Sequence, residues 1–413
     1  MNTFSILFLI ALAAMLIAEF LLGRRQIKHV ARHRDAVPAT FADDIDLQTH
    51  QKAADYTIAR TRFGLLTGIY AAAVLLLMTL GGGLEWIEQL RLQFVSAPLL
   101  GGTVFIFAVA LVSGILDLPV TLYKTFRLES RFGFNKTTPA LFVSDMVKSI
   151  ILMLVIGTPL ILAALWLMEL SGTWWWLHLW LLWVAFNLVA IWAYPNIIAP
   201  LFNRFEPLKD DSVTSQVTEL LDRTGFKSRG LFVVDGSRRS AHSNAYFTGL
   251  GRSKRVVFFD TLLETLNADE IVAVLAHELG HFKRKHIVKR IGTFFLLSLV
   301  SLAVLGWLIQ QTWFFTGLGM STPSNHAALV LFMLAGPVFL FFIQPISAWV
   351  SRKHEFEADD FASQHAQADH LVSALLKLYR DNANTLTPDP VYSAFYDSHP
   401  PASIRIKNLL AHS

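Results

Sequence analysis

Two histidines four residues apart, His277 and His281, have the spacing to bind one metal ion between them. Side chains at positions i and i+4 lie on the same face of an α-helix, with Cβ atoms about 5–6 Å apart. Glu278 is rotated about 100° from His277, so it can reach a water on that ion without being a ligand. This HExxH pattern predicts a metal site with a general base, as in metalloproteases. The alternative is a surface helix in which these residue types coincide by chance.

A third protein ligand is expected, because a catalytic zinc ion takes three and leaves one position open. We expect this ligand at Glu355, in the polar segment that follows the last apolar stretch. Asp359 lies one helical turn further on, where it can orient a ligating histidine. His354 is the rival ligand, and Glu357 is expected to be solvated. Four other histidines are also expected to be solvated: His29, His33, His50 and His370.

The chain contains no cysteine, which excludes disulfides and thiolate-bound metals. Two imidazoles and one carboxylate then suit zinc best, with one ion per chain. A transporter with a structural zinc is a competing interpretation, but such a site is closed by four ligands and leaves Glu278 without a role. The sequence has no basic patch with interleaved aromatic residues, so nucleic acid is not an expected partner.

The composition indicates that a lipid bilayer surrounds much of the chain. Hydrophobic residues make up 54% of the 413 residues and charged residues 16%, against a usual charged share of about a quarter. Seven segments are long and apolar enough to cross a bilayer, which requires about 20 helical residues. These predicted spans are 3–22, 64–83, 98–118, 149–170, 174–197, 291–311 and 326–346.

The charges between the spans predict an orientation. The positive residues near the first span follow its apolar stretch, which is not the order of a cleavable signal peptide. The segments 23–63, 119–148 and 198–290 are basic, whereas 84–97 carries one Arg and 312–325 no Lys or Arg. The positive-inside rule therefore places the N-terminus outside and the catalytic segments and C-terminus in the cytoplasm. The expected location is a bacterial inner membrane, or otherwise the endoplasmic reticulum.

The predicted fold is an all-α polytopic membrane protein with a small α+β, zincin-like cytoplasmic domain. Residues 1–197 hold five spans and 291–346 hold two, while 198–290 and 347–413 form the two halves of the catalytic domain. Asn267 is expected to cap the helix that carries the histidines, with Glu270 completing a capping box. Further predicted elements are a helix over Asp211–Phe226 closed by Gly225 and short strands at Leu231–Asp235, Ala245–Thr248 and Arg255–Phe259.

Several separated motifs together resemble the type I CAAX prenyl proteases, over nearly the whole chain. The motifs are His277–His281, Glu355 to Asp359, Ser243–Phe247, Phe132–Thr138, Pro200–Asn203, and His399–Pro401 with Arg405. The resemblance implies an integral-membrane zinc endopeptidase that removes the last three residues of prenylated proteins. It also implies a barrel of seven membrane helices around a large water-filled chamber, with the zinc site at its cytoplasmic end.

The resemblance assigns roles to individual residues. It makes Glu355 the third zinc ligand, and it implies that Asn244 and Ala245 on an edge strand pair with the substrate backbone. His399 and Arg405 are implied to line the catalytic cleft. Asn244 could instead be a turn residue, and His399 could serve only the structure around the prolines that follow it. The competing interpretation is a bacterial-type membrane protease that clears damaged membrane proteins with the same chemistry. The chain resembles these heat-shock proteases less, because they are shorter and have fewer spans.

Overall fold

The computed structural model describes residues 1–248 and 255–411, and it is mostly helical. It contains seven helical segments that are long and apolar enough to cross a membrane, which confirms the predicted number and fold class. Their bounds are Thr3–Arg32, Leu47–Met78, Pro98–Glu129, Pro139–Leu170, Gly172–Phe202, His286–Leu308 and Asn325–His365.

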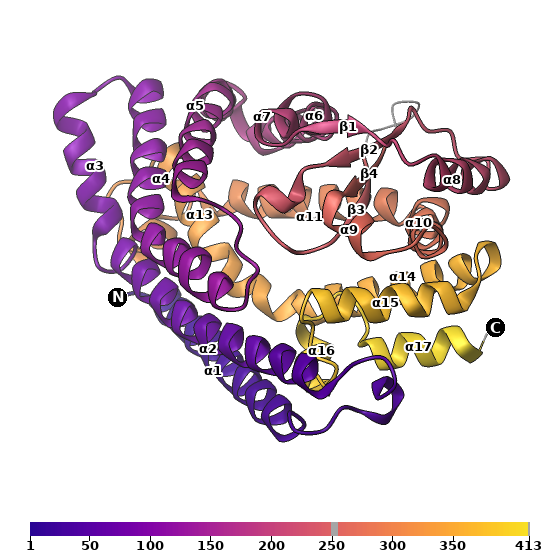
Figure 1. The fold of residues 1–413 in the computed structure, drawn as a ribbon. Helices are drawn as coiled ribbons and strands as arrows, with labels where there is room; N and C mark the ends of the chain where they lie inside the picture. The colour runs from indigo at the N-terminus through magenta and orange to yellow at the C-terminus, as the bar shows by residue number, and fades with distance from the viewer. Residues whose placement is uncertain (249–254, 412–413) are drawn as a thin grey trace.

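The first half of the chain contains the first five candidate membrane spans (Figure 1). Its helices are α1 (Thr3–Arg32), α2 (Leu47–Met78), α3 (Gly83–Phe94), α4 (Pro98–Tyr123), α5 (Pro139–Leu170), α6 (Trp175–Ala193) and α7 (Ala199–Phe202). The π-helical segments η2 (Lys124–Glu129) and η4 (Tyr194–Ile198) continue α4 and α6, and the short 3-10 turns are η1 (Ala39–Phe41) and η3 (Gly172–Trp174).

The second half combines membrane helices with the catalytic region. Its helices are α8 (Asp211–Arg223), α9 (Asp260–Thr265), α10 (Ala268–Lys283), α11 (His286–Leu308), α12 (Thr312–Gly317), α13 (Asn325–Leu340), α14 (Gln344–His365), α15 (Ala368–Asp381), α16 (Pro390–Tyr396) and α17 (Ala402–Ala411). Two 3-10 turns, η5 (Gly236–Arg238) and η6 (Phe341–Ile343), complete it.

Several membrane helices extend well beyond the predicted spans. Helix α2 begins at Leu47, whereas its predicted span begins at residue 64, and α1 continues to Arg32. The side chain of Asp46 caps α2 by accepting a hydrogen bond from the Thr49 N–H at 2.9 Å. Hydropathy detects only the apolar part of a helix, so it misses the polar turns that emerge from the bilayer. Figure 1 shows α1 and α2 running side by side, and the two helices are in contact.

The last candidate span leads directly into the catalytic region. Helix α13 passes through the turn η6 into α14, so the helical stretch from Asn325 to His365 is continuous. The predicted domain boundary at residue 346 falls inside α14, and the other predicted boundaries remain predictions. Glu355 is therefore positioned by an extension of a membrane helix.

A four-stranded sheet lies in the catalytic region, in the order β1-β2-β4-β3. The strands are β1 (Phe205–Pro207), β2 (Leu231–Val234), β3 (Ala245–Thr248) and β4 (Arg255–Phe259). Strand β2 is parallel to β4, and β3 is antiparallel to β4 at the edge of the sheet. The three predicted strands are confirmed, whereas β1 was missed because three residues ending in proline give no alternating pattern.

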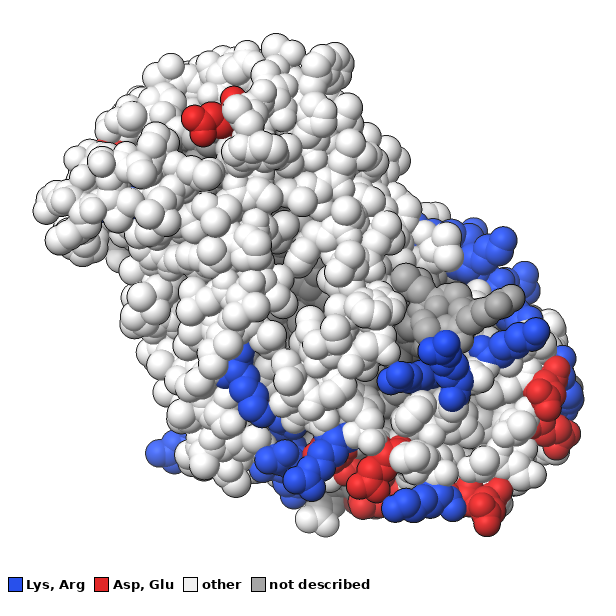
Figure 2. Space-filling model, turned by 90° about the horizontal axis from the view of Figure 1, so that it is seen from above, with Lys and Arg blue, Asp and Glu red and all other residues white. Residues whose placement is uncertain are grey.

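Two large hydrophobic clusters hold the molecule together. One joins helices from both halves of the chain and includes Phe8 of α1, Phe105 of α4 and Phe314 of α12. The other packs α8, α10 and α15 against the sheet and includes Val217 and Leu279. In Figure 2, most charged side chains on the visible face gather at one end, while the other end carries few. This distribution fits a molecule with one part in lipid and one part in water.

Candidate metal and catalytic site

Helix α10 begins with the predicted capping box. The Asn267 side chain accepts from the Glu270 N–H, and Glu270 accepts from the Asn267 N–H, both at 2.9 Å. Ser373 and Lys377 of α15 also donate to the buried Glu270 carboxylate, at 2.6 and 2.8 Å. Burial raises the pKa of Glu270, but these donors together outweigh it and lower the pKa. The start of the histidine helix is thus fixed to α15.

Close packing at Gly280 brings α14 against the histidine helix. A Cβ atom on Gly280 would lie 2.8 Å from the Cα of Ala358 and 3.0 Å from its carbonyl oxygen. Such a distance is too short for any side chain at position 280 without a backbone shift. The two helices therefore approach closely enough for Glu355, one turn before Ala358, to meet the histidines.

His277, His281 and Glu355 converge as the sequence predicts, and their ligand atoms form a possible metal site. The Nε2 atoms of His277 and His281 are 3.3 Å apart. Glu355 Oε1 lies 3.3 Å from His281 Nε2, and Glu355 Oε2 lies 3.6 Å from His277 Nε2. Two atoms that bind a tetrahedral zinc ion at about 2.0–2.1 Å lie about 3.3–3.4 Å from each other. The distances and the donor set both fit zinc.

Asp359 and Arg405 lie directly behind His277. Asp359 Oδ1 is 2.8 Å from His277 Nδ1, and Arg405 Nε donates to Asp359 Oδ2 at 2.9 Å. Asp359 is fully buried and Arg405 nearly so. Burial lowers the pKa of Arg405, but the neighbouring carboxylates outweigh it and raise the pKa. This ion pair can hold the Nδ1–H of His277, so that Nε2 faces the metal position.

A second polar chain lies behind His281, and sequence reasoning missed it. His286 Nδ1 lies 3.0 Å from His281 Nδ1, and His286 Nε2 lies 3.0 Å from Glu357 Oε2. Glu357, which we predicted to be solvated, is therefore also a partner of a buried histidine, while 32% of its side chain is exposed. The ring of His354 stacks on His286 with 3.9 Å between centroids. His354 is not part of the metal group found among the described residues, so the structure does not support it as rival ligand.

Helix geometry explains why His286 was overlooked. Lys285 separates α10 from α11 and has φ 58°, in the left-handed region that non-glycine residues rarely occupy. This turn brings His286 back beside His281, a contact that helical spacing does not give. His50 was also wrongly predicted to be solvated, since it is buried and its Nε2 lies 2.8 Å from the His33 carbonyl oxygen.

The remaining predicted site residues surround the metal group. His399 Nδ1 lies 2.6 Å from Glu355 Oε2, while 63% of the His399 side chain is exposed. The Glu355 carboxylate raises the pKa of His399. Glu278 is half-buried on α10, and its carboxylate also raises the pKa of His399. The exposed side of the site therefore carries Glu278 and His399.

Ala245 is the first residue of β3, the edge strand of the sheet, and Asn244 directly precedes it. Ala245 is buried and opposite Phe258 of β4, whereas Asn244 is exposed and accepts from the Ala245 N–H at 2.8 Å. The outer edge of β3 has no partner strand among the described residues. An extended peptide can add to such an edge.

An HExxH helix whose histidines converge with Glu355, in a chain with seven candidate membrane helices, defines a membrane-embedded metalloprotease. Residues 26–204 match the family described as "CAAX prenyl protease N-terminal, five membrane helices", and residues 207–413 match peptidase family M48. The chain belongs to the CAAX prenyl protease members of peptidase family M48. It is an integral, multi-pass membrane metalloprotease.

The matches to individual relatives cover most of this chain and most of each relative. CAAX prenyl protease 1 of Saccharomyces cerevisiae is 32% identical, with 90% of this chain and 88% of the relative covered. The mouse CAAX prenyl protease 1 homolog is 30% identical, with 95% and 92% covered. The crystal structure of S. mikatae Ste24p is similar with a TM-score of 0.91 and 30% identity over 99% of both chains.

Proposed function

We propose that the protein is a zinc-dependent endopeptidase that removes the C-terminal tripeptide of prenylated proteins. The convergence of His277, His281 and Glu355, with Glu278 on the exposed side, carries this proposal. The similarity to CAAX prenyl proteases over most of the chain supports the choice of substrate class.

Each residue of the site has a separate role in the proposed hydrolysis of the peptide bond. Zinc bound by the three ligands would polarise the scissile carbonyl and lower the pKa of a coordinated water. Glu278 accepts the proton of the attacking water and returns it to the leaving amine. His399 donates a hydrogen bond to the oxygen that becomes negative. Asp359 and Arg405 keep the ring of His277 in place.

The substrate backbone is proposed to pair with the free edge of β3. Main-chain groups supply the contacts in this mode of binding, so it tolerates varied side chains in the substrate. Ala245 begins the strand and Asn244 precedes it, and these two residues would hold the part of the substrate nearest the scissile bond. The site is proposed to face the cytoplasm, in a bacterial inner membrane or the endoplasmic reticulum, because the basic segments surround it.

Zinc content measured beside peptidase activity tests the assignment. We expect Glu278→Gln to retain one zinc ion per chain and to lose hydrolysis, because the change removes the base and leaves every ligand. His277→Ala, His281→Ala and Glu355→Ala should instead weaken zinc binding itself. Near-normal turnover in the Glu278→Gln protein would sink the proposed mechanism.

A further inference from the structure

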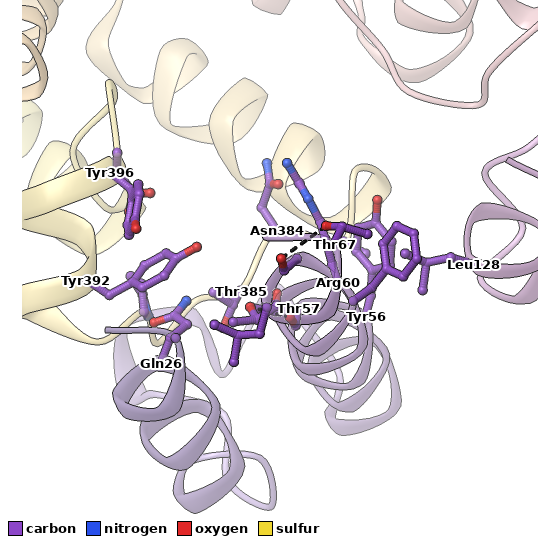
Figure 3. A pocket seen from close by; sticks show the side chains of 18 of the residues that line it. Gln26, Tyr56, Thr57, Arg60, Thr67, Leu128, Asn384, Thr385, Tyr392 and Tyr396 are labelled. Atoms are coloured by element: carbon purple, nitrogen blue, oxygen red, sulfur yellow. Dashed lines mark hydrogen bonds between the residues drawn. The ribbon is translucent and has the colours of Figure 1, made fainter. Parts of the chain in front are cut away.

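A cavity of about 820 Å³, lined by both polar and apolar side chains, adjoins the proposed catalytic site. It lies between α1, α2, α4 and the segment 379–401, and His399 forms part of its wall. Figure 3 shows Gln26 of α1, Arg60 of α2 and Tyr392 and Tyr396 of α16 around it. A volume of roughly 300–1,000 Å³ is typical of sites for small ligands, so a short peptide fits here.

The lining of this cavity is better suited to a peptide than to an isoprenoid. Several wall residues carry hydroxyl or amide groups that donate no side-chain hydrogen bond among the described residues, and a lipid chain cannot accept from them: Thr57, Asn384, Thr385 and Ser398. Covering polar groups with hydrocarbon costs free energy when they lose their water. The wall also contains Phe63, Leu65, Val120 and Leu128, so the cavity suits a peptide with aliphatic side chains better than a lipid chain.

A second cavity of about 650 Å³ adjoins the first. Residues that line both define a junction: Tyr56, Arg60, Thr121, Lys124 and Asn384. The junction contains two cations. Its Tyr56 hydroxyl donates to the Glu129 carboxylate in the wall of the second cavity at 3.0 Å, so that carboxylate is already hydrogen-bonded. Arg60 and Lys124 are both exposed, and neither has a carboxylate of the described residues within 4.0 Å. Two cations without ion-pair partners at the meeting point of two cavities are suited to bind an anion.

The carboxylates of the first cavity lie outside the junction. They are Glu19, Asp117 and Asp397. Asp117 accepts a hydrogen bond from the Thr121 hydroxyl at 3.1 Å, and burial raises the pKa of Asp397. Arg60 and Lys124 are the only Lys or Arg side chains in the described wall of the first cavity, so an anion inside the cavity is bound most favourably there.

We propose that the junction binds the free C-terminal carboxylate of the substrate. This inference rests on the proposed function, in which three residues follow the scissile bond. A fully extended tripeptide spans about 10 Å, and the cavity connects His399 with the junction. The carboxylate of the last residue then forms charge-assisted hydrogen bonds with Arg60 and Lys124. By binding this carboxylate, the junction restricts cleavage to a bond near the C-terminus of the substrate.

Two farnesylated CAAX peptides of the same sequence test this specificity, one with a free C-terminal carboxylate and one with a C-terminal amide. The zinc-loaded full chain should cleave the acid with a kcat/KM about tenfold above that of the amide, as one charge-assisted hydrogen bond predicts. The double variant Arg60→Gln/Lys124→Gln should cleave both peptides at the rate of the amide. The charge-retaining pair Arg60→Lys/Lys124→Arg should keep the preference for the acid.

Lys28→Gln is the matched control, because Lys28 is an exposed cation of α1 that lines neither cavity. It should retain the wild-type preference. Equal rates for acid and amide in the wild-type protein, or a preference that survives in Arg60→Gln/Lys124→Gln, would overturn the proposal.

A binding measurement separates this proposal from the proposed function. Titration calorimetry on the Glu278→Gln protein compares an N-acetylated aliphatic tripeptide that ends in a carboxylate with the same tripeptide as its amide. The acid should bind roughly tenfold more tightly, and adding Arg60→Gln/Lys124→Gln should remove the difference. If the acid still bound more tightly than the amide in that variant, the carboxylate would be bound by the metal and not by the junction. That result would overturn the proposal. Cleavage that does not depend on the farnesyl group would contradict only the proposed function.

Discussion

His286 contacts the proposed zinc ligand His281 through the ring nitrogen that does not face the metal position, as Asp359 contacts His277. Partners of this kind fix the ring of a ligating histidine, and their loss typically weakens metal binding about 10–100-fold. We expect His286→Leu to raise the zinc dissociation constant by that factor, because His281 loses the group 3.0 Å from its Nδ1. Competition with a chromophoric chelator measures the constant directly.

The control for this prediction is His370→Leu on α15, since His370 is not part of the metal group or its partners. Its zinc affinity should equal that of the wild-type protein. An unchanged affinity in His286→Leu would show that His286 fills space and does not position His281. Glu357→Gln should give a smaller effect than His286→Leu, because it removes only the outer end of the chain.

At the scale of residues, the sequence predicts those contacts that follow from the spacing of side chains along a helix. The positions of His277, His281, Glu355 and Asp359 follow from residues one turn apart on two helices, and the structure brings them together. The contact of His286 depends on the unusual backbone conformation at Lys285, which no residue type signals. Sequence spacing therefore finds the groups that face the metal more readily than those behind them.

At the scale of elements, the distance between α10 and α14 determines whether the metal group can form. We expect Gly280→Ala to force these helices apart, because the new methyl group would lie 2.8 Å from the Cα of Ala358. Overpacking of this kind costs about 1–3 kcal/mol. Glu355 would move away from the histidines, so zinc affinity and peptidase activity should fall together while the membrane helices remain folded.

Gly292→Ala on α11 is the matched control, because a Cβ atom there meets nothing within 4 Å. It should leave zinc content and activity unchanged. Normal zinc affinity in Gly280→Ala would mean that the spacing of the two helices is not critical for the site.

The elements themselves were predictable where a local signal exists. The capping box at Asn267 and three of the four strands follow from their sequences, since caps and alternating patterns are local. The polar extensions of α1 and α2 were not predicted, because hydropathy does not report where a helix continues into water. These extensions supply walls of the cavity beside His399, so that cavity could not be predicted from the spans alone.

At the scale of the whole molecule, the orientation in the membrane determines which proteins can reach the site. We expect reporter fusions at residues 90 and 318 to lie outside and those at 40, 235 and 380 to lie in the cytoplasm. The uneven distribution of Lys and Arg between the two sets of loops is the physical reason. A catalytic segment found outside would contradict both the orientation and the assumed side of the substrate.

The dependence of cleavage on a lipid distinguishes two roles for the whole molecule. Each methylene of a lipid that leaves water adds about 0.8 kcal/mol, so an isoprenoid can dominate recognition by a site beside membrane helices. We therefore expect the purified protein to cleave a farnesylated CAAX peptide between the modified cysteine and the next residue, and the unprenylated peptide much more slowly. A zinc chelator should abolish both reactions, and an unfolded membrane protein should compete poorly. Equal rates with and without the farnesyl group, together with ready cleavage of the unfolded protein, would instead favour a protease that clears damaged membrane proteins.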